Sequence, residues 1–171
     1  MSMCYPENTL LAFDKAAQVP GIKGIELDVQ LSKDGVIVVF HDETIDRVTY
    51  GSGRLTDYTL QELREIKFKD TEHFDCKESY IRIPTFEEVL ALLKPYCMEN
   101  GLRINVELKT SVIHYEGLEQ KTYDVIKKTG MEKYVIYSSF WAESVKKVKE
   151  LDPECQTGML AEKLSDCVKW G

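Results

Sequence analysis

The chain has 171 residues, of which 43% are hydrophobic, and this size and composition predict one domain that buries most of its apolar surface. Its 29 acidic residues outnumber its 22 lysines and arginines, which gives a formal net charge of -7. This charge argues against a general binding surface for nucleic acid or anionic membranes. A phosphate ester would bind only where a cation or a focused basic group offsets the acidic field.

The cysteine pattern indicates a reducing environment. The five cysteines are odd in number, and no two of them have C-x-x-C spacing, which argues against a disulfide framework or a zinc cluster. No window is long and apolar enough to span a membrane, and the N-terminus lacks the pattern of a secretory signal. We therefore expect an unprocessed, cytoplasmic protein.

The first predicted element is a helix that follows the sequence Pro-Glu-Asn-Thr at residues 6–9. Asn8 and Thr9 are both residue types that cap helix N-termini, and apolar residues recur at helical spacing after them. Pro20 and Gly21 then interrupt the pattern, so the helix should end before them.

A β-hairpin is predicted next. Residues 24–31 alternate strictly between apolar and polar side chains, which is typical of a strand. Residues 36–40 form a continuous apolar run of the kind found in buried strands, and the turn dipeptide Asp34-Gly35 lies between the two segments.

The composition becomes polar from residue 42 to about residue 82, and we interpret about residues 43–82 as an insertion. It contains one capping box, at residues 59–62, which predicts a short helix. A second capping box, at residues 85–88, predicts a longer helix that should end near Pro95.

The rest of the chain alternates between predicted strands and helices. We expect strands at residues 103–109, 134–140 and 156–160, and helices at residues 116–128 and 142–151. Strands separated by helices are typical of a parallel sheet.

Two carboxylates and an imidazole should meet on the hairpin. If Asp34-Gly35 forms a two-residue loop, Asp28 lies directly opposite His41, with the two side chains about 5 Å apart. Glu26 shares the face of Asp28 because the two residues are two positions apart on one strand. A longer loop would change the pairing of Asp28 with His41 but not this shared face.

Glu107 adds a third carboxylate on a separate strand, and Lys109 shares its face. Crowded carboxylates resist joint ionisation unless a cation holds them, and hard oxygen ligands favour Mg²⁺ or Ca²⁺ over zinc. Such a cation, together with Lys109, would bind a phosphodiester, while His41 could transfer protons near neutral pH.

The alternative is that residues 26, 28 and 30 are only the solvated face of an antiparallel sheet. The alternation of strands and helices downstream favours a functional role, because strands of a parallel barrel are covered on both faces and seldom carry charges without one. His73 and His114 lie in polar loops, and we expect no catalytic role for them.

The chain resembles the glycerophosphodiester phosphodiesterase family in the order and spacing of its motifs, from about residue 5 to residue 160. The matching segments are Pro6-Glu7-Asn8-Thr9, Glu26-Leu27-Asp28-Val29, Lys33-Asp34-Gly35, His41-Asp42, Ile45-Asp46-Arg47, Pro84-Thr85-Phe86 and Glu107-Leu108-Lys109. This resemblance implies an α/β fold of the (β/α)8 TIM-barrel type, with an insertion after the strand that ends at His41.

The resemblance also implies an active site. Carboxylates matching Glu26, Asp28 and Glu107 hold a metal ion in the family, Lys109 matches a lysine that faces the phosphate, and His41 matches one of two histidines that serve as general acid and base. The reaction that it implies yields glycerol 3-phosphate and an alcohol, through attack by a neighbouring glycerol hydroxyl or by water.

The chain departs from the family at both ends. The family's first barrel strand ends in His-Arg-Gly, which should lie just before Met1, and a barrel usually takes about 250 residues. We therefore expect an incomplete barrel that lacks the first strand and the last two strand-helix units, with open edges through which the chain could self-associate. The alternatives are a catalytically impaired remnant that binds metal or phosphate, and a related phosphodiesterase that acts on inositol phospholipids.

Overall fold

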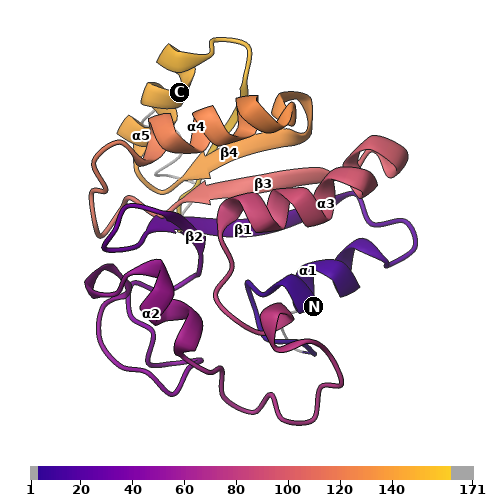
Figure 1. Cartoon of the computed structure of the whole chain (residues 1–171). Coiled ribbons are helices and arrows are strands. Elements are labelled where there is room, and N and C mark those ends of the chain that lie inside the picture. Colours follow the sequence, from indigo (N-terminus) through magenta and orange to yellow (C-terminus); the bar gives the residue numbers. More distant parts are fainter. Residues whose placement is uncertain (1–3, 163–171) are drawn as a thin grey trace.

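The computed structural model describes residues 4–162, in which five strands form one open sheet in the order β2-β1-β3-β4-β5 (Figure 1). The strands are β1 (Gly24–Leu31), β2 (Ile37–Val39), β3 (Arg103–Leu108), β4 (Val135–Ser139) and β5 (Gln156–Met159). The α-helices are α1 (Leu10–Ala17), α2 (Leu60–Glu65), α3 (Phe86–Asn100), α4 (Leu118–Thr129) and α5 (Ala142–Leu151). Short 3-10 turns lie at Leu55–Asp57, Glu78–Tyr80 and Glu132–Tyr134.

The sheet is parallel except for one strand. β1, β3, β4 and β5 run in the same direction, and β2 pairs antiparallel with the last three residues of β1. Helix α4 connects β3 to β4 and α5 connects β4 to β5, as the predicted alternation requires. Most boundaries lie within two residues of those predicted from the sequence.

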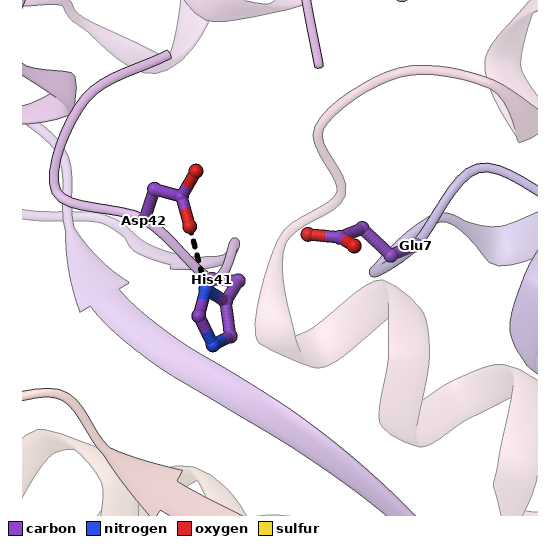
Figure 2. A group of neighbouring side chains, drawn as sticks. All are labelled: Glu7, His41 and Asp42. Atoms are coloured by element: carbon purple, nitrogen blue, oxygen red, sulfur yellow. Dashed lines mark hydrogen bonds and ion pairs between the residues drawn. The ribbon is translucent and has the colours of Figure 1, made fainter. Parts of the chain in front are cut away.

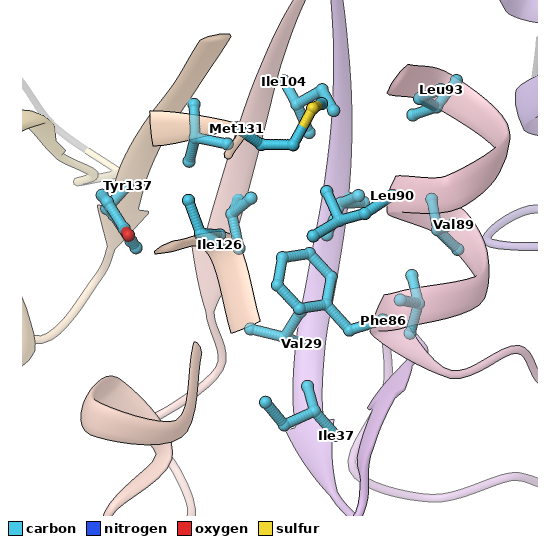
Figure 3. Close-up of a cluster of buried hydrophobic side chains, with 14 of the residues drawn as sticks. Val29, Ile37, Phe86, Val89, Leu90, Leu93, Ile104, Ile126, Met131 and Tyr137 are labelled. Carbon is cyan, nitrogen blue, oxygen red and sulfur yellow. The ribbon is translucent and has the colours of Figure 1, made fainter. Parts of the chain in front are cut away.

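The main hydrophobic core lies between one face of the sheet and helices α1, α3 and α4. Figure 3 shows its side chains from the strands, from α3 and from α4. Leu27 of β1 and Ile104 of β3 are fully buried there, together with Leu90 of α3 and Ile126 of α4. Burying an aliphatic side chain of this size stabilises the fold by about 1.5–3 kcal/mol. Because side chains alternate along a strand, the polar residues of β1 and β3 point to the opposite face.

Helix α1 begins as the sequence predicts, with Thr9 as its cap. The Thr9 hydroxyl accepts a hydrogen bond from the backbone N–H of Ala12 at 3.2 Å. Asn8, the other candidate, instead adopts the left-handed backbone conformation, with φ of 53°. Both predicted capping boxes are also present, at the starts of α2 and α3.

The predicted two-residue hairpin loop is wrong by one residue. Val29 pairs with Val39, so the backbone of Asp28 lies opposite Phe40 and not opposite His41. The N–H of Ser32 donates to the carbonyl of Val36, which leaves a three-residue loop. Gly35 ends this loop at φ of +74°, a conformation that glycine adopts without steric cost and that is typical of three-residue hairpin loops.

The prediction that the third helix ends near Pro95 is also wrong, because α3 continues to Asn100. Proline removes one backbone hydrogen bond within a helix, but Pro95 is exposed, so the freed carbonyl can bind water. Leu93 and Cys97 on either side are buried, and their packing favours a continuous helix. The helix ends at Gly101, which is left-handed at φ of 66°.

Residues 43–82 contain α2 and two of the 3-10 turns and pack around a second, smaller core. This core joins the segment to the hairpin, and its buried members are Val38, Phe40, Ile45, Leu55, Leu63, Phe68 and Ile83. Residues 43–82 are therefore packed on a core of their own, and Phe40, the residue before His41, belongs to that core. Within the described part of the chain, no helix has the length and apolar character needed to cross a bilayer.

Candidate active site

Three carboxylates converge on the face of the sheet that the helices leave open. Glu26 and Asp28 extend from β1, and Glu107 extends from β3. Asp28 is the direct register partner of Glu107 across the parallel pair. One oxygen of each of the three lies within 4.8 Å of the others.

The surroundings of Glu26 and Asp28 disfavour the ionisation of these two carboxyl groups. The pKa of Glu26 is raised to about 7, first because the carboxyl group is partly withdrawn from water and then because Asp28 and Glu107 are negatively charged. Burial also raises the pKa of Asp28, which is only 2% exposed, although a hydrogen bond from Asn8 opposes this shift. A cation between the three groups would relieve this repulsion.

The two oxygens of Asp28 have different surroundings. Oδ2 accepts a hydrogen bond from the Asn8 side-chain amide at 2.8 Å. Oδ1 is buried and has no hydrogen-bond partner among the described residues, and the nearest cation, the Lys109 ammonium, is 3.9 Å away. A buried carboxylate oxygen without a partner is energetically costly, so Oδ1 is suited to a ligand.

Lys109 supplies positive charge beside the carboxylates. Its Nζ lies 3.1 Å from Oε1 of Glu107, which is itself buried. Burial lowers the pKa of Lys109, but the charges of Glu107 and Asp28 outweigh this effect and raise it above the ordinary value. The ammonium group therefore stays charged near neutral pH.

The donor set fits a hard divalent cation. Carboxylate oxygens are the ligands that Mg²⁺ and Ca²⁺ prefer, and oxygens bound to one such ion lie roughly 3–5 Å apart. The spacing of the three carboxylates falls in this range, and Asp28 Oδ1 has no competing partner. The residues present therefore fit the group that the sequence predicted.

His41 follows β2, and its ring contacts the Asp42 carboxylate, with Glu7 close by (Figure 2). Its Nδ1 lies 2.6 Å from Oδ1 of Asp42, and Asp42 accepts two hydrogen bonds from Arg47, at 2.6 and 3.0 Å. Arg47 also bonds to Glu7, which comes from the chain before α1. Hydrogen bonds from Arg47, and then from His41, hold the pKa of Asp42 below its ordinary value.

The ionised Asp42 affects His41 in turn. Burial lowers the pKa of His41, but the hydrogen bond to Asp42 and the charge of Asp28 outweigh it, so the net shift is upward. Because an ionised carboxylate only accepts hydrogen bonds, Nδ1 carries the proton. This leaves Nε2, the other ring nitrogen, for proton exchange.

Gln30 holds the backbone around His41. It is completely buried, and its Nε2 donates to the carbonyls of Phe40 at 2.7 Å and Asp42 at 2.8 Å. Its Oε1 accepts a hydrogen bond from the Tyr115 hydroxyl at 2.7 Å. Gln30 is therefore not a residue on a solvated face, as the alternative interpretation of the sequence required.

A cavity of about 380 Å³ opens beside these groups, between α1 and the first half of β1. Its polar wall includes Asn8, Glu26, Asp28 and His41, and its apolar wall includes Phe13 of α1. A small molecule could therefore reach Glu26, Asp28 and the imidazole from one side.

The structure brings together all five candidate residues predicted from the sequence, namely Glu26, Asp28, His41, Glu107 and Lys109. His73 and His114 lie elsewhere: His73 contacts Phe74 in the predicted insertion, and His114 stacks on Trp141. The contacts of Asn8, Gln30 and Arg47 could not be predicted from the sequence. Two of these lie in motifs that carried the resemblance, but nothing in their spacing indicated their partners.

Comparison with known proteins identifies a family whose sequence pattern the chain matches. A sequence model of the glycerophosphoryl diester phosphodiesterase family matches residues 1–166. A glycerophosphodiester phosphodiesterase of Caldanaerobacter subterraneus is 42% identical over 155 residues, which cover 91% of this chain and 61% of that protein. Glycerophosphodiester phosphodiesterase 1 of Homo sapiens is 32% identical, over 90% of this chain and 44% of that protein.

Solved structures show the same fold. A glycerophosphodiester phosphodiesterase of Agrobacterium tumefaciens superimposes with a TM-score of 0.74 at 28% identity, over 91% of this chain and 61% of that one. A phosphodiesterase of Oleispira antarctica, in complex with the product sn-glycerol-3-phosphate, superimposes with a TM-score of 0.71 at 30% identity, over 96% and 66%. The sheet is thus part of a (β/α)8 TIM-type barrel, and the chain spans about three fifths of the length of the Caldanaerobacter relative.

Proposed function

Since the chain belongs to the glycerophosphoryl diester phosphodiesterase family, we propose that it hydrolyses glycerophosphodiesters to glycerol 3-phosphate and an alcohol. The observation that carries this proposal is the convergence of Glu26, Asp28 and Glu107 beside Lys109, with His41 on the wall of the same cavity. The proposal concerns the activity of a whole barrel, and the chain matches about three fifths of the length of the Caldanaerobacter relative.

Glu26, Asp28 and Glu107 would hold a divalent cation, either Mg²⁺ or Ca²⁺. When bound, this cation would supply the positive charge that draws a phosphodiester into an acidic protein and polarises its phosphoryl oxygens. Lys109 would bind a non-bridging phosphate oxygen, because its ammonium group lies next to the carboxylates and stays charged.

His41 would transfer protons through Nε2. During attack on phosphorus, the attacking hydroxyl or water loses a proton, the bond from phosphorus to the leaving oxygen breaks, and that oxygen gains a proton. Asp42 fixes the ring and keeps the proton on Nδ1, so Nε2 is the nitrogen that can take up or deliver a proton.

The predicted cellular setting also stays a proposal. The four described cysteines have free thiols, which supports a reducing, cytoplasmic location. Self-association through the open sheet edges is a second prediction, supported by the position of β5 at the edge of the sheet that residues 4–162 form.

The test is hydrolysis of glycerophosphocholine with Mg²⁺, Ca²⁺ or EDTA. We would assay this chain beside a chimera in which residues 4–160 replace the matching segment of the Caldanaerobacter relative, since the two are 42% identical. We expect cation-dependent release of glycerol 3-phosphate by the chimera, with a loss of at least about 10²-fold in Glu26→Gln and in His41→Ala.

The outcomes separate the candidates. An active chimera beside an inactive chain would mean that the site is competent but that this chain alone is a binding remnant. A chimera that hydrolyses inositol phospholipids, but no glycerophosphodiester, would support the related phosphodiesterase. A folded chimera that hydrolyses none of the diesters would refute the roles proposed for Glu26, Asp28, His41, Glu107 and Lys109.

A further inference from the structure

Asn8 combines an unusual backbone with a direct contact to the carboxylate site. Among the described residues only Asn8 and Asp70 are non-glycine residues with positive φ, at 53° and 55°. Such a conformation costs free energy and is retained where the surrounding structure requires it. For Asn8 the requirement is not helix capping, because Thr9 performs that role.

The side chain of Asn8 explains the conformation. Its Nδ2 donates to Oδ2 of Asp28 at 2.8 Å, across a gap of twenty residues in sequence. Asp28 lies in the middle of β1 and is almost completely buried, so its carboxylate has few other ways to be oriented. The amide determines which oxygen is occupied, and it leaves Oδ1 free on the side of Glu107 and Lys109.

The residues on either side of Asn8 anchor it. Glu7 bonds to Arg47, and Thr9 caps α1 while donating its own hydroxyl proton to the Pro6 carbonyl at 2.7 Å. These contacts hold the backbone at both ends of residue 8, so its side chain has little freedom to leave Asp28. Thermal motion of Oδ1 should be reduced accordingly.

We propose that Asn8 is a positioning residue that orients the Asp28 carboxylate for cation binding, with the left-handed backbone at residue 8 directing the amide to Oδ2. The proposal rests on the cation site described under the proposed function. Removing a group that hydrogen-bonds to a metal ligand commonly lowers metal affinity by about 10- to 100-fold. In this proposal Asn8 acts through its hydrogen bond to Asp28 and is not itself a cation ligand.

The decisive variant is Asn8→Gly, because glycine adopts positive φ without strain while losing the amide. Binding of CaCl₂ and of MgCl₂ to the purified chain would be measured by calorimetry, without substrate. We expect the dissociation constant to rise about tenfold or more. Asp70→Gly is the matched control, since it makes the same backbone change at an exposed residue that belongs neither to the three carboxylates nor to the lining of their cavity, and we expect a change of less than about twofold.

A purely structural role would give a different result. In that case Asn8→Gly would lower the free energy of unfolding in EDTA, yet the folded variant would bind cation as tightly as the wild type. That result overturns the proposal and leaves the phosphodiesterase function intact. If the wild-type chain binds neither cation, the proposed cation site fails, and the role of Asn8 fails with it.

A double-mutant cycle tests the contact independently. In an Asp28→Asn background, Asn8→Gly should cause little further loss of affinity, because the carboxylate that it orients is already gone. Equal losses in both backgrounds would show that Asn8 acts elsewhere. If Asn8→Gly does not fold, Asn8→Ala removes the same amide and completes the same cycle.

Discussion

The Nδ1 atom of His41 lies 2.6 Å from Oδ1 of Asp42, its neighbour in sequence, and this contact leaves Nε2 as the ring nitrogen that Asp42 does not occupy. Adjacent residues rarely interact in this way on a strand, because successive side chains point to opposite faces. Here β2 has already ended at Val39, so the side chains of residues 41 and 42 do not have to alternate between the two faces of the sheet. Arg47 then holds Asp42 with two hydrogen bonds.

Asp42→Asn should reduce kcat/KM of the active chimera by about 10²- to 10⁴-fold, because the amide no longer favours the correct tautomer of His41. It should also move the limb of the pH-rate profile that belongs to His41 towards lower pH, since Asp42 raises the pKa of the imidazole. Asp46→Asn is the control: it removes the same charge from an exposed residue of the same loop. Identical profiles for the two variants would exclude a role for Asp42.

Gln30→Leu should destabilise the fold by about 1–3 kcal/mol, because the backbone carbonyls around His41 and the hydroxyl of Tyr115 lose their buried partner. Denaturation with urea measures the loss. Tyr115→Phe removes only one contact and should cost less, about 1 kcal/mol. We also expect Gln30→Leu to lower kcat more than Tyr115→Phe does, and equal kcat values would argue that residues 40–42 are held by other contacts.

Lys109→Met should lower the free energy of unfolding by about 3–5 kcal/mol in EDTA, since it leaves Glu107 and Asp28 buried without their cationic partner. Saturating Ca²⁺ or Mg²⁺ should recover part of this loss by replacing the missing positive charge. Thermal melts with and without cation provide the measurement. A loss that is the same in both conditions would mean that the cation binds away from Lys109.

In EDTA the folded chain should lose stability as the pH rises from 5 to 8. The pKa of Glu26 is raised from 4.5 to about 7, so its contribution is complete below 4.5 and is lost as the pH passes through 7. We expect a change on the order of 1 kcal/mol, because Glu26 retains contact with solvent and screening weakens its interactions.

Glu26→Gln isolates this effect, since the pKa values of Asp28 and His41 are also raised and act in the same direction. The variant should lose less stability between pH 5 and pH 8 than the wild type, as measured by urea denaturation in EDTA. Equal losses in the two proteins would place the titration on other groups.

The pairing register of the hairpin could not be predicted from the local residue pattern, although the faces of its side chains could. Alternation along β1 correctly placed Glu26 and Asp28 on one face, because that follows from strand geometry alone. The residue opposite Asp28 depends on the length of the loop. The loop that ends at Gly35 has three residues and not the predicted two, which shifts the pairing by one position. His41 still reaches the cavity because it lies beyond the end of β2 and is not held by the pairing.

The sequence by itself determined the strand and helix pattern, the capping boxes and the two pairs of residues that share a face, Glu26 with Asp28 and Glu107 with Lys109. These features depend on spacing within one element, where periods of 2 and 3.6 residues set the geometry. Only the tertiary structure decided that Asn8 bonds to Asp28, that Gln30 holds the chain at His41, and that Arg47 links Asp42 to Glu7. Those contacts join residues 5 to 40 positions apart in the sequence. The packing of the helices and the hairpin against the sheet selects the partners, and the periodicity within a single element cannot predict them.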